Sequence, residues 1–257
     1  MKEPSFATDG LSSQAAASVL RSLQERKYCD FDLVCQGHSI PVHKAVVCAQ
    51  SRVFANICSR RSQRAAPISY GIPHSDIQTV ELMVQYLYTG KHTYSVRGPI
   101  VSHDPSLPIS ETRMIDNPKY IRNKAAIVTV LSAHIKLLDL AETCLVDELV
   151  VRVVDEFRAV LSHPDYGYCF MALLEIIPSV YEQQNSARSL LRKECVAATT
   201  AGFGPWLTAH GSHRQALDKL LVTVPEFSKD LIDSFITTKQ HPVKKQDSMS
   251  KSEMMRQ

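Results

Sequence analysis

Three cysteines and two histidines fall within one short segment, YCDFDLVCQGHSIPVHKAVVC at positions 28–48. Zinc is commonly bound by cysteine thiolates and histidine imidazoles, so the spacing of these residues tests whether the segment could form a zinc site. Cys29, Cys35, His38 and His43 read as C-x5-C-x2-H-x4-H. A two-Cys, two-His finger needs about twelve residues between its middle ligands, so that a hairpin and a helix converge on one ion. We therefore expect no metal here, and instead buried thiols and a hydrogen-bonded histidine.

Catalytic motifs are also weak in this chain. The run GHSIP begins like the G-x-S-x-G nucleophile elbow, but Pro41 replaces the closing glycine and the serine would lie inside a strand. No nucleophile with a base, no recognisable carboxylate pair and no glycine-rich phosphate loop stands out, and the chain holds nine glycines in 257 residues. We expect no enzyme, no catalytic residues, no cofactor and no small-molecule substrate.

Composition indicates a globular protein, since 44% of the residues are hydrophobic and 21% are charged. Because the net charge is only +3, nucleic-acid binding would require a local cluster of basic residues. The two basic runs, SRRSQR and VKKQ, are not accompanied by aromatic residues that could stack on bases. Seven cysteines without a CxxC pair favour reduced thiols over disulfides. No window suggests a membrane span or a secretory signal, so we expect a cytoplasmic or nuclear protein.

Periodicity predicts strands and short helices in the first ninety residues. Phe31, Leu33 and Cys35 alternate, Gln36-Gly37 supplies a turn, and a second strand follows, which predicts a β-hairpin. A helix over 11–26 precedes the hairpin, and two short helices follow it, the second capped by Ser51. The other predicted elements are a strand through Ile68, Tyr70 and Ile72, then a helix with a Ser75–Gln78 capping box that stops at Gly90.

The rest of the chain alternates between proline-rich and helical patterns. Four prolines within residues 95–123 predict a loop insertion, and apolar stripes predict helices from residue 124 onward. His134 lies on one such stripe, so we interpret it as a core residue. A helix kinked or broken at Pro178 follows, and Pro225 opens another. The polar residues 239–257 are expected to be disordered.

Several motifs, in this order, resemble the BTB/POZ domain family. CDFDLVCQGHSIPVHKAVVCAQSRVF (29–54) places an Asp before an apolar strand, then an apolar-x-apolar-His-Lys run and Ser-x-x-Phe. VELMVQYLYTGKHTY (80–94) holds a Leu-Tyr-Thr-Gly. LLDLAETCLVDEL (137–149) is similar to a further family segment, with Cys144 where an aromatic is common. The helical remainder looks like the C-terminal extension of fungal BTB proteins.

The resemblance implies an α+β fold: a small three-stranded sheet with a β-hairpin, surrounded by helices and followed by an all-α extension. The domain map that it implies is a partly disordered leader (1–16), a BTB/POZ domain (17–162) with its insertion, a helical extension (163–238) and the tail (239–257). Asp30 and Lys44 match family positions that line a charged pocket near the subunit interface. Alternatively, both are ordinary solvated charges.

The resemblance also implies function. We expect a protein-interaction scaffold, homodimeric through the helix that carries Val19, Leu20 and Leu23. The alternatives are a substrate adaptor of a cullin-based ubiquitin ligase and a transcriptional co-regulator. Cullin-binding relatives commonly carry an apolar-x-Glu motif where this chain has SRRSQRAAPISY, with Arg60, Arg61 and Arg64 and no acidic residue. This possible partner-binding loop therefore predicts weak cullin binding.

Overall fold

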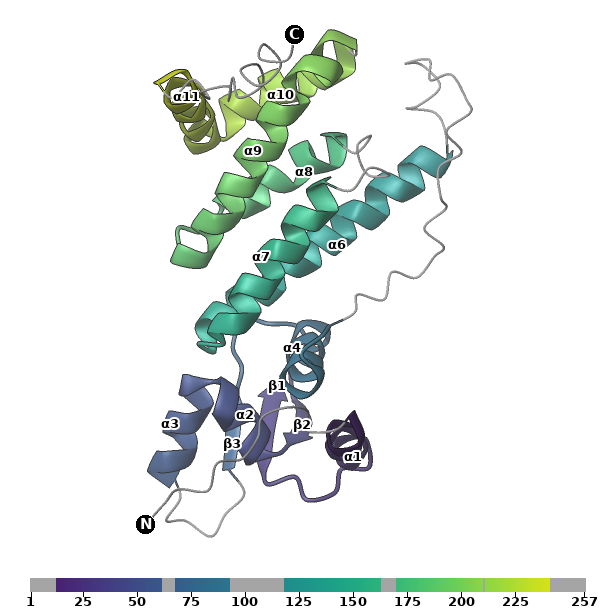
Figure 1. Ribbon diagram of the computed structural model, residues 1–257, viewed down its shortest axis with the longest axis vertical. Coiled ribbons are helices and arrows are strands. Elements are labelled where there is room, and N and C mark those ends of the chain that lie inside the picture. The colour runs from purple at the N-terminus through teal and green to yellow at the C-terminus, as the bar shows by residue number, and fades with distance from the viewer. Residues whose placement is uncertain (1–12, 62–67, 93–117, 163–169, 210, 241–257) are drawn as a thin grey trace, which may run out of the picture.

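The computed structural model describes residues 13–61, 68–92, 118–162, 170–209 and 211–240. A small sheet with four helices lies at one end, a long helix pair continues from it, and the last helices gather at the other end (Figure 1). The N-terminal elements are α1 (Ser13–Gln24), β1 (Phe31–Cys35), β2 (His38–Val42), α2 (Lys44–Gln50), α3 (Arg52–Arg61), β3 (Ile68–Gly71) and α4 (Ile77–Thr89). The C-terminal helices are α6 (Pro118–Thr143), α7 (Asp147–Ser162), α8 (Phe170–Tyr181), α9 (Ser186–Ala209), α10 (Gly211–Thr223) and α11 (Pro225–Gln240).

The sheet has the strand order β2-β1-β3. Strand β1 pairs antiparallel with β2, Phe31 opposite Val42, and parallel with β3, Phe31 opposite Ile68. Phe31 and Cys35 are buried, as the alternation predicts. Gln36 and Gly37 have φ values of 50° and 80°, and positive φ at both central residues suits the twist of a two-residue hairpin turn. The predicted hairpin and the α+β fold are confirmed.

The helix caps agree with the sequence at α3 and differ at α4. Ser51 Oγ accepts a 3.2 Å hydrogen bond from the Phe54 N–H, so Ser51 caps α3 as predicted. The predicted Ser75–Gln78 capping box is wrong. Asp76 is the N-cap, and its Oδ1 accepts from the Thr79 N–H at 2.8 Å and from the Thr79 hydroxyl at 2.9 Å. A carboxylate satisfies the free N–H groups and also suits the positive end of the helix dipole.

Three predicted boundaries need correction. Helix α6 begins at Pro118, inside the predicted loop 95–123, because proline is well suited to the first helical turn, where its missing N–H costs nothing. Helix α8 continues through Pro178 to Tyr181, so of the two predicted alternatives, a kink or a break, the break is wrong. Helix α11 extends to Gln240, two residues into the predicted tail. The remainder of the loop and the tail, and the leader up to residue 12, lie outside the described residues.

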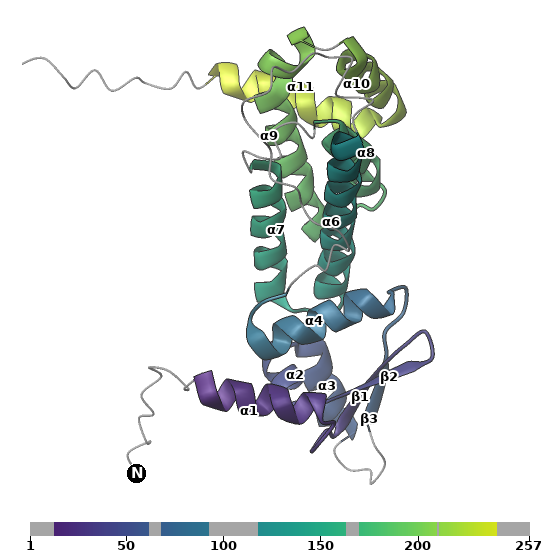
Figure 2. The same ribbon diagram turned by 90° about the vertical axis from the view of Figure 1, so that its right-hand side faces the viewer.

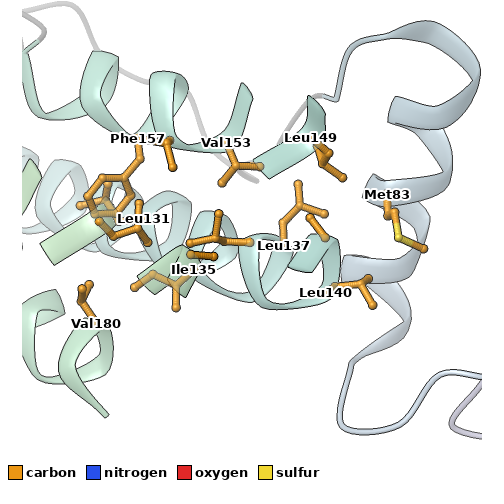
Figure 3. Packing of buried hydrophobic residues seen from close by; sticks show 14 of the residues in the cluster. Met83, Leu131, Ile135, Leu137, Leu140, Leu149, Val153, Phe157 and Val180 are labelled. Carbon is orange, nitrogen blue, oxygen red and sulfur yellow. The ribbon is translucent and has the colours of Figure 1, made fainter. Parts of the chain in front are cut away.

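One hydrophobic core runs through both halves of the molecule. Leu131 of α6 and Val153 and Phe157 of α7 form its central part, and Met83 of α4 reaches toward Leu140 at the base of α6 (Figure 3). Because α4 packs against α6, the sheet-containing end and the helical end are continuous. Within the described residues, every helix is too short or too polar to cross a membrane.

Candidate functional site

A closed hydrogen-bond network surrounds His43, between β2 and α2. The backbone N–H of His43 donates to the Tyr88 hydroxyl at 2.8 Å, and that hydroxyl donates to His43 Nδ1 at 2.7 Å. His43 Nε2–H donates to the Lys27 carbonyl at 2.8 Å. Burial raises the pKa of Tyr88 to about 12, so its hydroxyl keeps its proton. The network fastens the segment after α1, the start of α2 and the end of α4 to one another.

Asp30 and Lys44 lie together beside this network. Asp30 Oδ1 accepts the Lys44 backbone N–H at 2.8 Å, so the aspartate caps the first residue of α2 from a distant point in the chain. Lys44 Nζ lies 4.0 Å from Asp30 Oδ2, at the outer limit of an ion pair. Both side chains are partly exposed, and such pairs contribute little to stability. Their assignment to a charged pocket stays a prediction.

The four metal candidates of the first segment do not converge. Cys29 Sγ lies 3.9 Å from His43 Nε2, but that nitrogen already donates to Lys27. Cys35 Sγ donates to the Ser75 carbonyl at 3.2 Å. His38 Nδ1 lies 3.2 Å from the carbonyl of Gln36, two positions earlier in the chain.

Helix α1 rests against α4 at the edge of the sheet-containing end (Figure 2). Leu20 and Leu23 are half-buried against the core, whereas Val19 is 41% exposed. Tyr28, four residues past the end of α1, is 85% exposed. The three predicted self-association residues therefore divide into two anchors and one residue that is open to a partner. Sequence reasoning did not identify Tyr28, because its exposure follows from the turn that carries it.

The basic cluster is only partly described. Arg60 is exposed near the end of α3, and Arg61 is the last residue of that helix. The side chain of Arg61, and all of Arg64, lie outside what the structure describes.

A cavity of about 750 Å³ lies between the sheet-containing end and the helices. The β3–α4 connection (72–76) and α6 provide most of its lining, with Gln36 and Gln183 at its sides. Lys136 and Asp76 both line it, and Lys136 Nζ donates to Asp76 Oδ2 at 2.9 Å. Burial alone would raise the pKa of Asp76, but the bonds from Lys136 and Thr79 outweigh burial and hold it below its ordinary value. The lining residues are far apart in sequence, so no local pattern predicts this cavity.

A second exposed apolar surface lies on α11. Ile232, Phe235 and Ile236 are exposed at 59%, 43% and 51%. Their i, i+3, i+4 spacing places them on one side of the helix, while Phe227 and Leu231 are buried. The spacing is visible in the sequence, but it does not tell which apolar face packs inward and which stays exposed.

Comparison with known proteins identifies the first part of the chain. The BTB/POZ domain family matches residues 20–101. TD and POZ domain-containing protein 2 of Mus musculus is 25% identical over 100 residues, which cover 37% of this chain and 28% of that protein. The chain therefore spans little more than a quarter of that relative.

Among solved structures, the BTB domain of zebrafish PATZ1 is similar with a TM-score of 0.39 and 14% identity, covering 61% of this chain and 98% of that one. The BTB domain of human gigaxonin gives a TM-score of 0.33 and 16% identity, covering 60% and 99%. The predicted likeness to fungal members is not tested by these matches. From the motifs, the sheet and the family match, we conclude that residues 20–101 of this chain form a BTB/POZ domain.

Proposed function

We propose that this protein is a non-enzymatic scaffold that self-associates through α1 and holds protein partners with its helical half. BTB/POZ domains mediate protein–protein interactions and dimerisation. The observation that carries the proposal is that the apolar residues of α1 have two different environments, one against the core and one open to solvent. Leu20 and Leu23 fasten the helix to the core, so that Val19 is presented on an ordered surface. An ordered apolar surface binds a partner without first losing the entropy of a flexible segment.

The helical half supplies a second surface of the kind that partners use. Ile232, Phe235 and Ile236 form an exposed apolar stripe on α11, and exposed apolar residues that are contiguous mark interaction sites more often than single ones do. Helix α11 lies at the opposite end of the molecule from α1 (Figures 1 and 2). A dimer formed through α1 therefore leaves α11 accessible.

The two alternative functions lack an observation in their favour. A cullin adaptor would need an acidic acceptor after α3, and the stretch 59–70 contains none. A transcriptional co-regulator would bind particular partners, and neither the α1 surface nor the α11 surface indicates which partners those are.

Co-purification of two differently tagged copies tests the proposal. Wild-type copies should recover each other, and Val19→Asp in both copies should abolish recovery, because a charge would be buried without a partner at the interface. Val151→Asp is the matched control, since Val151 is an exposed valine of α7 and its change should leave recovery intact.

Failure of wild-type copies to recover each other would contradict self-association. Loss of recovery with Ile232→Asp, but not with Val19→Asp, would place the self-association surface on α11 instead.

A further inference from the structure

Three titratable side chains meet where the BTB/POZ domain joins the helix pair. His92 follows α4 two residues after Gly90, His134 lies in α6 and Glu156 lies in α7. The histidine side chains are buried, with 0% and 2% of their surface exposed, and Glu156 retains 25%. Buried polar groups of this kind need a specific reason to be there, because desolvation is costly.

The ligand atoms of these side chains face a common point. His92 Nε2 lies 2.8 Å from Glu156 Oε2, and His134 Nε2 lies 3.8 Å from the same oxygen. Each of the three residues offers one ligand atom, and these atoms lie within 4.8 Å of one another. Zinc bonds of about 2.0–2.1 Å in a tetrahedron place ligand atoms roughly 3.3 Å apart. The observed separations bracket that value, so small side-chain shifts would admit an ion.

Neighbouring groups orient two of the ligands as metal sites require. His134 Nδ1–H donates to the Val130 carbonyl at 2.8 Å, so the neutral ring carries its lone pair on Nε2, the atom that faces Glu156. Arg152 Nε donates to Glu156 Oε1 at 2.6 Å, which leaves Oε2 turned toward the histidines. The same guanidinium is a positive charge near the site and lowers its affinity for a cation.

We propose that His92 Nε2, His134 Nε2 and Glu156 Oε2 form a binding site for a divalent cation of the zinc class, with water as a fourth ligand. Two imidazoles and one carboxylate are an established donor set for zinc. His134 Nε2 and Glu156 Oε2 lie 3.8 Å apart, a separation at which a cation between the two atoms could bind both. A proton on His134 is the alternative to such a cation.

The site goes beyond the proposed function, because its ligands lie on elements other than α1 and α11. A bound ion would join the segment after α4 to the α6–α7 pair, and so fasten the BTB/POZ domain to the helical half. Loss of the ion should therefore weaken this junction without removing the self-association surface.

Zinc titration of the full, untagged chain after treatment with a chelator tests the proposal. We expect one bound zinc per chain by elemental analysis and a higher midpoint of thermal unfolding with zinc than with magnesium. Glu156→Gln should lose at least tenfold in zinc affinity. His38→Gln, at an exposed histidine of the rejected Cys/His segment, should retain the zinc.

Cobalt substitution keeps the test decisive even where Glu156→Gln fails to fold. The wild-type cobalt complex should show d–d absorption without a thiolate charge-transfer band, since the donor set holds no sulfur. The absence of stoichiometric zinc, a thiolate band, or full zinc binding by folded Glu156→Gln would each overturn the proposal.

Discussion

The two halves of the molecule are held together by different kinds of polar contact. In the BTB/POZ domain, the decisive polar residues, Asp30, His43 and Ser51, lie within a short recognisable stretch and cap or connect neighbouring elements. In the helical half, the buried Arg188 forms an ion pair with the partly exposed Asp139, 49 positions away. The first group of residues belongs to one sequence motif, even though the partner of His43, Tyr88, lies 45 positions away. Arg188 belongs to no motif that the sequence shows, so its pairing with Asp139 is visible only in the fold.

The helical ion pair is built to be fully satisfied. Arg188 Nε donates to Asp139 Oδ1 at 2.7 Å, and Nη2 donates to Oδ2 at 2.6 Å. The remaining Nη1 donates to the Ser179 carbonyl, so the guanidinium connects α6, α8 and α9. Arg188 is 3% exposed, so its charge depends on these partners rather than on water.

The largest effect expected from this comparison is at Asp139. Replacement of Asp139 by Ala leaves the Arg188 charge buried without its acceptor, which should lower the free energy of unfolding by about 3–5 kcal/mol. Arg214→Ala, which breaks an exposed pair on α10, should change it by less than about 1 kcal/mol. Urea denaturation measures both variants. Similar losses in the two would show that the Asp139–Arg188 pair has no special part in the helical half.

An intermediate effect is expected at Tyr88 in the BTB/POZ domain. Tyr88→Phe removes the hydroxyl that both accepts from and donates to His43, which should cost about 1–3 kcal/mol. Tyr28→Phe is the matched control and should be neutral, because Tyr28 is largely exposed. Equal stability of the two variants by urea denaturation would mean that the His43 network does not hold the domain together.

The smallest effect concerns the charge on Asp76 at the boundary between the halves. The pKa of Asp76 is lower in the folded protein than in the unfolded chain, where it is near 4. The ionised carboxylate therefore stabilises the fold fully above the unfolded pKa, and this contribution is lost as the pH falls through the folded pKa. Asparagine also caps helices, so Asp76→Asn removes mainly the charge. Its thermal midpoint should lie below wild type at pH 7 and approach it near pH 3. A constant difference would contradict the account.

The sequence predicted the local parts of the fold well. The hairpin, the Ser51 cap and the Gly90 stop each follow from residues within a few positions of one another. The α4 start shows the limit, because Ser75–Gln78 and Asp76–Thr79 offer overlapping caps, and Lys136, distant in sequence, adds a further bond to Asp76.

The candidate surfaces were predictable only in part. The sequence predicts a self-association helix around Val19, Leu20 and Leu23, and this stays a prediction. The sequence does not tell which of the three pack inward, and Leu20 and Leu23 are half-buried against the core because α1 packs on α4. The apolar stripe around His134 predicts a core residue, and nothing in its own helix indicates that His92 and Glu156 lie beside it. Tertiary packing decides such sites, so they become visible only once the helices are placed.

Sedimentation equilibrium of the full chain at micromolar concentrations tests the central claim most directly, that the BTB/POZ domain self-associates through α1. The account predicts twice the chain mass for wild type and for Val151→Asp, and a single chain mass for Val19→Asp with an unchanged circular dichroism spectrum. A single chain mass for the wild type, or a dimer that persists in Val19→Asp, would contradict it.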